Sequence, residues 1–396
     1  MHRLRSDARA AGVLAWIGLL LIGWTGLLVP SLIREIERDF GQSDAGLGIY
    51  YFVGAAAYAS GSFGGGMLTE RFGRRRVLTV ATALLGLGTA VLGIVPAWAV
   101  VLVAAVPAGF GAGAIDGGVN GLVLDLYPTA RGRALNTLHL FFSVGALTSP
   151  LVVGRLVEAG IPWQALVVAT AAVTIPVAVL WATVSLPHGR HRASTVEGQP
   201  RLGRLALRWP LVVLEIAIAC YVASEVGVSN WLIRFLESAP LALATTGLSL
   251  FWGGLALGRL LSARYSDRFD HLRYATVSAL VAGGATIVAV VAPSTEASIA
   301  LFAVVGFASG PIFPLIIAIG GERHPGRSAA VSGFLTASAV VGGVIYPPLM
   351  GFLSVNVGLA VAMLGAGVLA VACAGALLLA RPRPAAPAAV PDRGST

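Results

Sequence analysis

Twelve apolar runs dominate this chain, and each is about as long as a helix that crosses a bilayer. A hydrocarbon core about 30 Å thick requires roughly 20 apolar residues of helix. The runs lie near residues 10–32, 45–65, 77–95, 97–126, 134–156, 165–186, 211–235, 241–261, 274–291, 297–320, 329–355 and 359–380. The sequence therefore predicts an all-α membrane protein with 12 transmembrane helices.

Positive charge falls in alternate gaps between these runs. The chain has 27 Arg and no Lys, and with both termini in the cytoplasm 22 of the Arg lie in cytoplasmic segments. Four lie outside (Arg34, Arg38, Arg155 and Arg234), and Arg259 stands at a helix end. Because cytoplasmic loops carry the excess of positive residues, this bias predicts cytoplasmic N- and C-termini. The Ala-, Gly- and Arg-rich composition is typical of a bacterium, so we expect a bacterial plasma (inner) membrane.

Composition excludes several other classes. Hydrophobic residues make up 57% of the chain and charged residues 11%, which excludes a soluble domain. The formal charge of +9 falls on arginines that flank apolar runs, so we expect no nucleic-acid partner. Cys220 and Cys373 have no CxxC or His partner nearby, so no metal site is expected. A chain without Lys has no P-loop lysine and no Schiff-base lysine, which excludes an ATP-driven pump and a lysine-dependent enzyme.

The two halves of the chain repeat at an offset of 197 residues. Residues 66–76 (GMLTERFGRRR) fall on residues 263–273 (ARYSDRFDHLR), and an acid, Arg, Phe and a final Arg recur. We therefore predict two six-helix bundles related as parallel repeats. The predicted units are an N-terminal bundle (1–186), a basic cytoplasmic linker (187–208), a C-terminal bundle (209–381) and a disordered cytoplasmic tail (382–396).

Residues 66–76 resemble the loop signature of the major facilitator superfamily, with Glu70 where Asp is commoner. Gly66 and Gly73 permit a tight turn between helices. In the superfamily this loop pairs with an acid at the end of the fourth helix and latches the outward-facing state, and Asp125 occupies that place. The resemblance implies a conformational latch made of Gly66, Glu70, Arg71, Gly73, Arg74, Asp125, Asp267 and Arg268. Arginines that serve only to orient the protein are the alternative.

Ionisable side chains at bilayer depth are costly, so each is a functional candidate. Asp116 lies about 15 Å from the end of the fourth run, near the midplane, and Asn120 shares its helix face. In the next run Asn136 and His139 also share a face. The fourth run is rich in glycine around Asp116, which lets neighbouring helices approach closely.

These positions resemble the fucose–proton symporter family of the superfamily. That family carries an acid followed four residues later by Asn in the fourth helix, and a Leu-Asn-x-x-polar stretch like residues 135–139 in the fifth. Residues 221–225 (YVASE) and 231–234 (WLIR) resemble its seventh helix. One departure is Gly26, which stands where the family's first helix typically has an acid.

The resemblance and the residues together predict a site at the midplane between the halves. Asp116 and Glu225 are the candidates for proton coupling; a protonated structural acid and helix-to-helix bonding are the alternatives. The candidates for solute binding are Asn120, Asn136, His139, Tyr221, Ser229, Asn230, Trp231 and Trp24, with Tyr50, Tyr51 and Trp252 as further aromatic platforms. Each aromatic residue also suits packing. We expect Arg259 and Glu215 to form a local ion pair near the cytoplasmic helix ends. No arginine is then expected at the midplane, which argues against a strongly anionic solute.

The expected protein is not an enzyme but a secondary transporter that takes up a neutral sugar or related polyhydroxylated solute with protons by alternating access. It needs no cofactor beyond the proton gradient, and we expect a monomer. A proton-coupled multidrug or small-molecule exporter of the same superfamily is the alternative, since residues 145–154 partly resemble an antiporter signature. A receptor-like sensor on the same fold is a more distant one.

Overall fold

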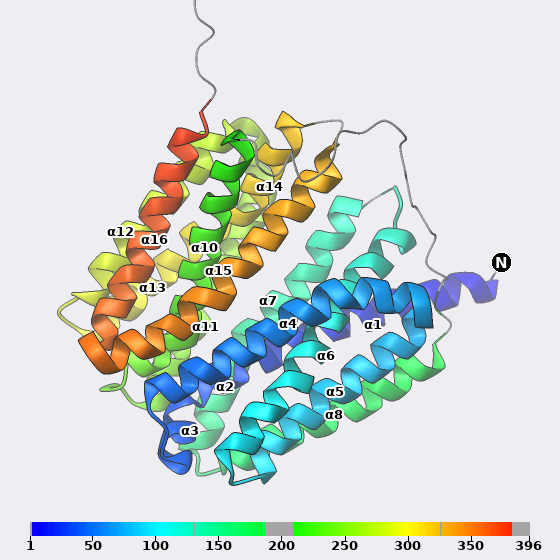
Figure 1. The fold of residues 1–396 in the computed structure, drawn as a ribbon, viewed down its shortest axis with the longest axis horizontal. Helices are drawn as coiled ribbons and strands as arrows, with labels where there is room; N and C mark the ends of the chain where they lie inside the picture. The colour runs from blue at the N-terminus through cyan, green and yellow to red at the C-terminus, as the bar shows by residue number, and fades with distance from the viewer. Residues whose placement is uncertain (1, 130, 185, 187–208, 325–326, 382–396) are drawn as a thin grey trace, which may run out of the picture.

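The computed structural model describes residues 2–129, 131–184, 186, 209–324 and 327–381, and in these ranges every regular element is a helix (Figure 1). The elements are α1 (His2–Gly26), α2 (Leu28–Ser31), α3 (Ile33–Phe40), α4 (Asp44–Phe72), α5 (Arg74–Ile94), α6 (Trp98–Leu126), α7 (Arg131–Glu158), α8 (Trp163–Thr183), α10 (Trp209–Phe235), α11 (Leu241–Tyr265), the short η1 (Ser266–Arg268), α12 (His271–Val290), α13 (Thr295–Ser309), α14 (Ile312–Arg323), α15 (Ser328–Val357) and α16 (Leu359–Leu379).

These helices form the 12 predicted spans. Among the described residues, 11 segments are long and apolar enough to cross a membrane, with α1 and α2 joined in the first of these and α13 and α14 in the ninth. The remaining span is α4, whose glycines, tyrosines and charged end lower its hydropathy although its 29 residues are ample for a crossing. It packs against α6 on one side and α15 on the other.

The two halves repeat the same packing. In the first half α4 packs on α6, α5 on both α6 and α8, and α1 on α7. In the second half α11 packs on α13, α12 on both α13 and α16, and α10 on α15. The halves meet along two seams, α4 against α15 and α7 against α11 (Figure 1). In the order of spans these are the second with the eleventh and the fifth with the eighth, as two parallel repeats related by a twofold axis require.

One end of the molecule is sealed by contacts between the halves. Arg34 of α3 donates hydrogen bonds to three carbonyls at the end of α10, those of Ile233 (2.8 Å), Ala239 (2.8 Å) and Leu236. We call the end that carries α3 the sealed end. The opposite end, where α4 turns into α5, is called the open end, because the ion pair found there, between Arg74 and Asp125, joins residues of the same half.

The sequence-based boundaries were wrong at two places. Gly66 was expected to turn the chain, but it lies inside α4, which continues to Phe72. The turn falls at Gly73 alone, whose φ of 82° is readily adopted only by glycine. The helix α3 was not foreseen, since its eight residues are too few and too charged for a span. The predicted linker (187–208) and tail (382–396) lie outside the described residues.

Candidate functional site

Asp116 is held by two side chains that donate to its two carboxylate oxygens. Tyr58 of α4 donates its hydroxyl to Oδ2 (2.9 Å), and Asn120, one turn along α6, donates Nδ2 to Oδ1 (2.8 Å). The glycines of α6 make the first contact possible: a Cβ at Gly117 would lie 2.7 Å from the carbonyl oxygen of Ser62 on α4. Each carboxylate oxygen therefore has a hydrogen-bond partner of its own, one from α4 and one from α6.

Glu225 has a corresponding arrangement in the second half. Tyr221, one turn earlier on α10, donates its hydroxyl to Oε2. The guanidinium of Arg259 on α11 places Nη2 at 3.9 Å from the other carboxylate oxygen, Oε1. The side chains of Arg259 and Glu225 are 28% and 10% exposed, so the pair is enclosed but reachable from one side.

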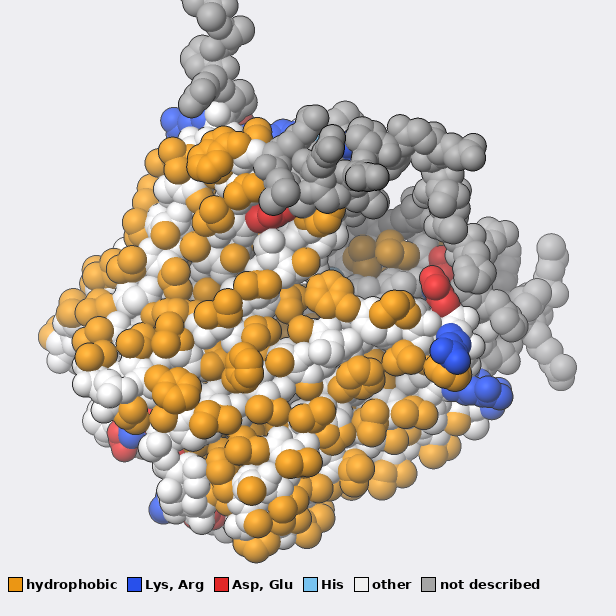
Figure 2. All heavy atoms as spheres, viewed as in Figure 1, with side chains coloured by type: hydrophobic (Ala, Val, Ile, Leu, Met, Phe, Trp, Pro, Cys, Tyr) orange, Lys and Arg blue, Asp and Glu red, His pale blue; other side chains and the backbone are white. Residues whose placement is uncertain are grey.

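His139 belongs to α7, the helix of the first half that packs against α11 of the second half. It lies within electrostatic range of both Asp116 and Arg259. Its side chain and that of Asn136 are nevertheless exposed, and both lie in the first third of α7. Figure 2 shows the molecular face hollowed between the two halves, on the side away from α3. We call Tyr58, Asp116, Asn120, His139, Tyr221, Glu225 and Arg259 the central polar cluster.

The position of Arg259 corrects the sequence-based interpretation. It was expected in a local pair with Glu215, but it pairs with Glu225. Glu215 and Glu225 are ten residues apart on α10, or about 15 Å along the helix axis. Only Glu225 lies at the depth that the side chain of Arg259 reaches. The site therefore contains a deep arginine, and the reason for restricting the solute to a neutral one no longer holds.

Several predicted solute-binding residues are occupied by packing in this conformation. Trp231 is fully buried and donates Nε1 to the Pro347 carbonyl (2.8 Å). Ser229 is buried and accepts from Nε1 of Trp252 (2.9 Å). Trp24 likewise donates to Thr170 (3.1 Å), and Tyr50 packs against Tyr51 and Trp98. The backbone carbonyl of Asn230, not its side chain, accepts from Tyr51 (3.3 Å).

The predicted latch residues fall into separate contacts at the open end. Arg74 donates to Asp125 (2.6 Å) and to the carbonyl of Gly121 (3.3 Å), which ties the start of α5 to the end of α6. The other members do not join this pair. Arg71 lies over the ring of Phe72, Glu70 is exposed, Asp267 lies 3.9 Å from His271, and Arg268 lies over the ring of Tyr265.

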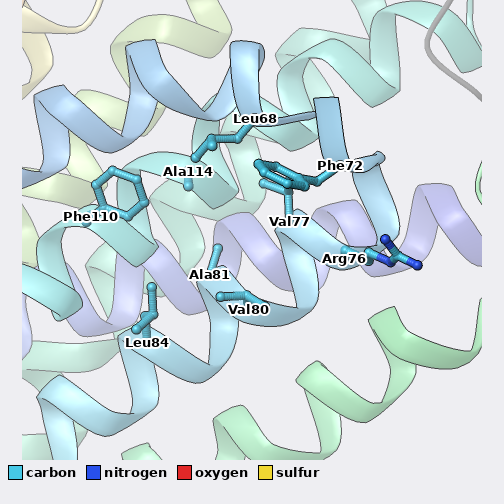
Figure 3. Close-up of a pocket in the computed structure, with 9 residues that line it drawn as sticks. All are labelled: Leu68, Phe72, Arg76, Val77, Val80, Ala81, Leu84, Phe110 and Ala114. Carbon is cyan, nitrogen blue, oxygen red and sulfur yellow. The ribbon is translucent and has the colours of Figure 1, made fainter. Parts of the chain in front are cut away.

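A separate cavity of about 310 Å³ lies between α4, α5 and α6 (Figure 3). Its walls are apolar, apart from the stem of Arg76, and all come from the first half: Leu68, Phe72, Arg76, Val77, Val80, Ala81, Leu84, Phe110 and Ala114. It includes no member of the central polar cluster. We therefore do not assign it to the transported solute.

A deep polar cluster between two repeated helix bundles, in a molecule that is sealed at one end, is typical of a membrane carrier for a small solute. Among the described residues no group of three His, Cys, Asp or Glu is placed to hold a metal ion. The class that the fold and the site define is a multi-pass membrane transporter. The family model of the Major Facilitator Superfamily matches residues 14–336 and 242–395, and the chain belongs to this superfamily.

Individual relatives share the fold but differ in their solutes. The chain is 25% identical to a probable sulfoacetate transporter of Cupriavidus necator over 384 residues, covering 86% of each chain. It is 26% identical to a glucose/galactose transporter of Brucella abortus over 367 residues, covering 85% of each. The crystal structure of the E. coli fucose:proton symporter matches with a TM-score of 0.64 at 18% identity, over 94% of this chain and 98% of that one.

Proposed function

We propose that this protein takes up a sugar or a related polyhydroxylated solute together with protons, by alternating access across a bacterial inner membrane. The observation that carries the proposal is Asp116, a carboxyl group in mid-span with one hydrogen-bond donor on each oxygen. Ionisable groups at this depth mark solute or proton pathways. The sugar carriers among the relatives, from Brucella abortus and E. coli, support the solute class.

The hydrogen bonds of Asp116 correspond to one step of the cycle. An ionised carboxylate only accepts, so the donors Tyr58 and Asn120 suit the state after proton release. A protonated carboxyl group has one O–H donor and still accepts through its remaining lone pairs. Loading a proton would therefore change the donor and acceptor roles in the hydrogen bond between Asp116 and Tyr58, which joins α6 to α4.

The arginine distribution gives the orientation that we propose. With cytoplasmic termini, the sealed end faces outside and the open end faces the cytoplasm. The conformation described above is then inward-facing, with the ionised Asp116 directed toward the compartment where protons are released. Rocking of the two halves about the α4–α15 and α7–α11 seams would expose the same residues to the outside.

The proposal is tested by following external pH in a lightly buffered suspension of de-energised cells that express the protein. Sugars, polyols and sugar acids are added one at a time. Alkalinisation by one of them is the expected result, since a symporter carries protons inward with its solute. Cells that express the Asp116→Asn variant should give no such signal, and a signal equal to that of wild type would rule out Asp116 as the proton carrier.

Export is the rival that this experiment separates. Relatives include a multidrug resistance protein of Mycobacterium tuberculosis that matches 36% of this chain at 29% identity. An exporter exchanges its substrate for protons. A proton response to cationic drugs, with silence toward every sugar, polyol and sugar acid, would replace uptake by export.

A further inference from the structure

Arg259 has unused hydrogen-bonding capacity deep in the molecule. A guanidinium group carries five N–H donors in a planar fork. The carboxylate nearest to it, Oε1 of Glu225, lies 3.9 Å from Nη2, beyond the 2.7–3.2 Å of a hydrogen bond. The other oxygen of Glu225 already accepts from Tyr221. The ion pair therefore balances charge while it leaves the donor fork of Arg259 free for another acceptor.

The Arg259 side chain extends toward Glu225 and not toward the nearby end of its helix, where exposure of the charge to water would cost less free energy. Arg259 is six residues from the end of α11, about 9 Å along the helix axis. Long basic side chains near helix ends usually extend to the interface, where water solvates the charge. This one lies beside Glu225 and within electrostatic range of His139 on the opposite half. An ionisable side chain within a span is a candidate for contact with the solute as well as for pairing with an acid.

The polar side chains around Arg259 define what else the anion carries. His139 and Asn136 are exposed on the facing helix, α7, and both carry hydrogen-bonding groups suited to hydroxyls. Asn120 and Asp116 lie beyond them on α6. The cluster thus offers the guanidinium group of Arg259 on one half, and on the other half the neutral polar side chains of His139, Asn136 and Asn120 together with the acid Asp116.

We propose that the transported solute carries a carboxylate, bound by the fork of Arg259 with His139 opposite, and hydroxyl groups that contact Asn120 and Asn136. This inference rests on the proposed uptake function and narrows its solute class to sugar acids or similar hydroxy acids. Arginine binds a carboxylate through two parallel N–H···O bonds, which gives the site selectivity for a planar oxyanion over a neutral sugar.

The test uses full-length protein in proteoliposomes, with counterflow of radiolabelled D-glucuronate and D-gluconate compared with D-glucose and D-galactose. Wild type should take up at least one of the two acids with an affinity at least tenfold higher than for either neutral sugar. Arg259→Gln should lower the affinity for the acids at least tenfold more than the affinity for the neutral sugars, with Arg259→Lys in between. Arg264→Gln, an exposed arginine at the open end of the same helix, is the matched control.

A second variant guards against a folding defect in Arg259→Gln, which leaves Glu225 without its cation. His139→Gln keeps the Glu225–Arg259 pair and should lower the affinity for the acids selectively. Equal affinity for acids and neutral sugars, or equal losses for both in the two variants, overturns the carboxylate assignment while sugar uptake stands. Silence toward all four probes, together with a proton response to drugs alone in the cell assay, overturns both proposals.

Discussion

Asp116 is the residue on which coupling depends most directly. Replacing it with Asn keeps an acceptor and the shape but removes the ionisable group, so solute exchange should persist while proton-driven accumulation is lost. Counterflow in proteoliposomes measures exchange, and uptake under an imposed pH gradient measures accumulation. We expect counterflow within about threefold of wild type and accumulation reduced to the equilibrium level. Glu296→Gln, which removes an exposed acid at the start of α13, is the control for loss of negative charge.

Sequence alone predicted those parts of the site that depend on spacing along one helix. Asp116 and Asn120 share a face because they are four residues apart, and the structure joins them. Tyr58 escaped prediction because its partner lies 58 positions away on another helix, and the close approach of α4 and α6 that joins them is a property of packing. Arg259 was misassigned for the same reason: the direction in which a long side chain extends depends on the neighbouring helix.

Among the elements, α3 is the one that links the halves at the sealed end. Arg34 contributes charged hydrogen bonds to three carbonyls at the end of α10, each worth about 1.5–3 kcal/mol. Arg34→Ala should therefore shift the conformational equilibrium toward opening of the sealed end by at least tenfold. Spin labels at Ser43→Cys and Ser238→Cys, in a background without Cys220 and Cys373, report the distance across this end.

Arg155→Ala is the matched control for this experiment. Arg155 lies near the same end, but its hydrogen bond, to the Leu151 carbonyl (3.2 Å), stays within its own helix. Its replacement should leave the label distances as they are in the parent. If the distance distribution of the Arg34→Ala variant equalled that of the labelled protein without this substitution, contacts other than those of Arg34 would hold the sealed end closed.

The sealed end should also respond to pH through Glu37. Burial, followed by the hydrogen bond to Asp44, raises the pKa of Glu37 from 4.5 to about 9 despite Arg234 nearby. Opening exposes Glu37 to water and returns its pKa toward 4.5. Between pH 4.5 and pH 9 the sealed form therefore carries a proton on Glu37 that the open form has lost. Sealing is therefore favoured at low pH and is lost as pH rises toward 9, by up to tenfold per pH unit.

The same spin-label pair measures this dependence between pH 5 and pH 9. The groups that face Glu37 are Asp44 of α4, Arg234 of α10 and the phenol of Tyr51. Glu37→Gln keeps the hydrogen-bonding shape without the titratable group, so its distance distribution should stay constant over this range. A wild-type distance distribution that does not change with pH would contradict this prediction. It would show that Glu37 binds its proton equally well in the sealed and the open form.

The features of the whole molecule were predicted from sequence more completely than those of single residues or helices. Span number and the repeat follow from apolar length and from the 197-residue offset, and both are properties of the chain alone. The two seams between the halves were not predicted. They depend on which small residues meet across the interface, and Gly48 of α4 meets Pro348 and Gly351 of α15.

This seam supplies a matched pair of variants for alternating access. A Cβ at Gly48 would lie 2.6 Å from the carbonyl oxygen of Pro348, a backbone atom that cannot move without shifting α15. A Cβ at Gly54, on the same helix, would meet nothing within 4 Å. Gly→Ala in a helix otherwise stabilises by about 1 kcal/mol, so the two variants differ chiefly in the contact between the halves.

Gly48→Ala should hold the halves apart at the sealed end, while Gly54→Ala should leave them as in wild type. We expect the first variant to lengthen the distance between labels at residues 43 and 238 and to slow uptake at least tenfold. Binding of solute from the sealed-end side should be retained, because the central polar cluster lies away from the seam. If both variants transported at the wild-type rate, closure of the α4–α15 seam would not be a required step, and the rocking of two rigid halves would have to be replaced by a movement within one of them.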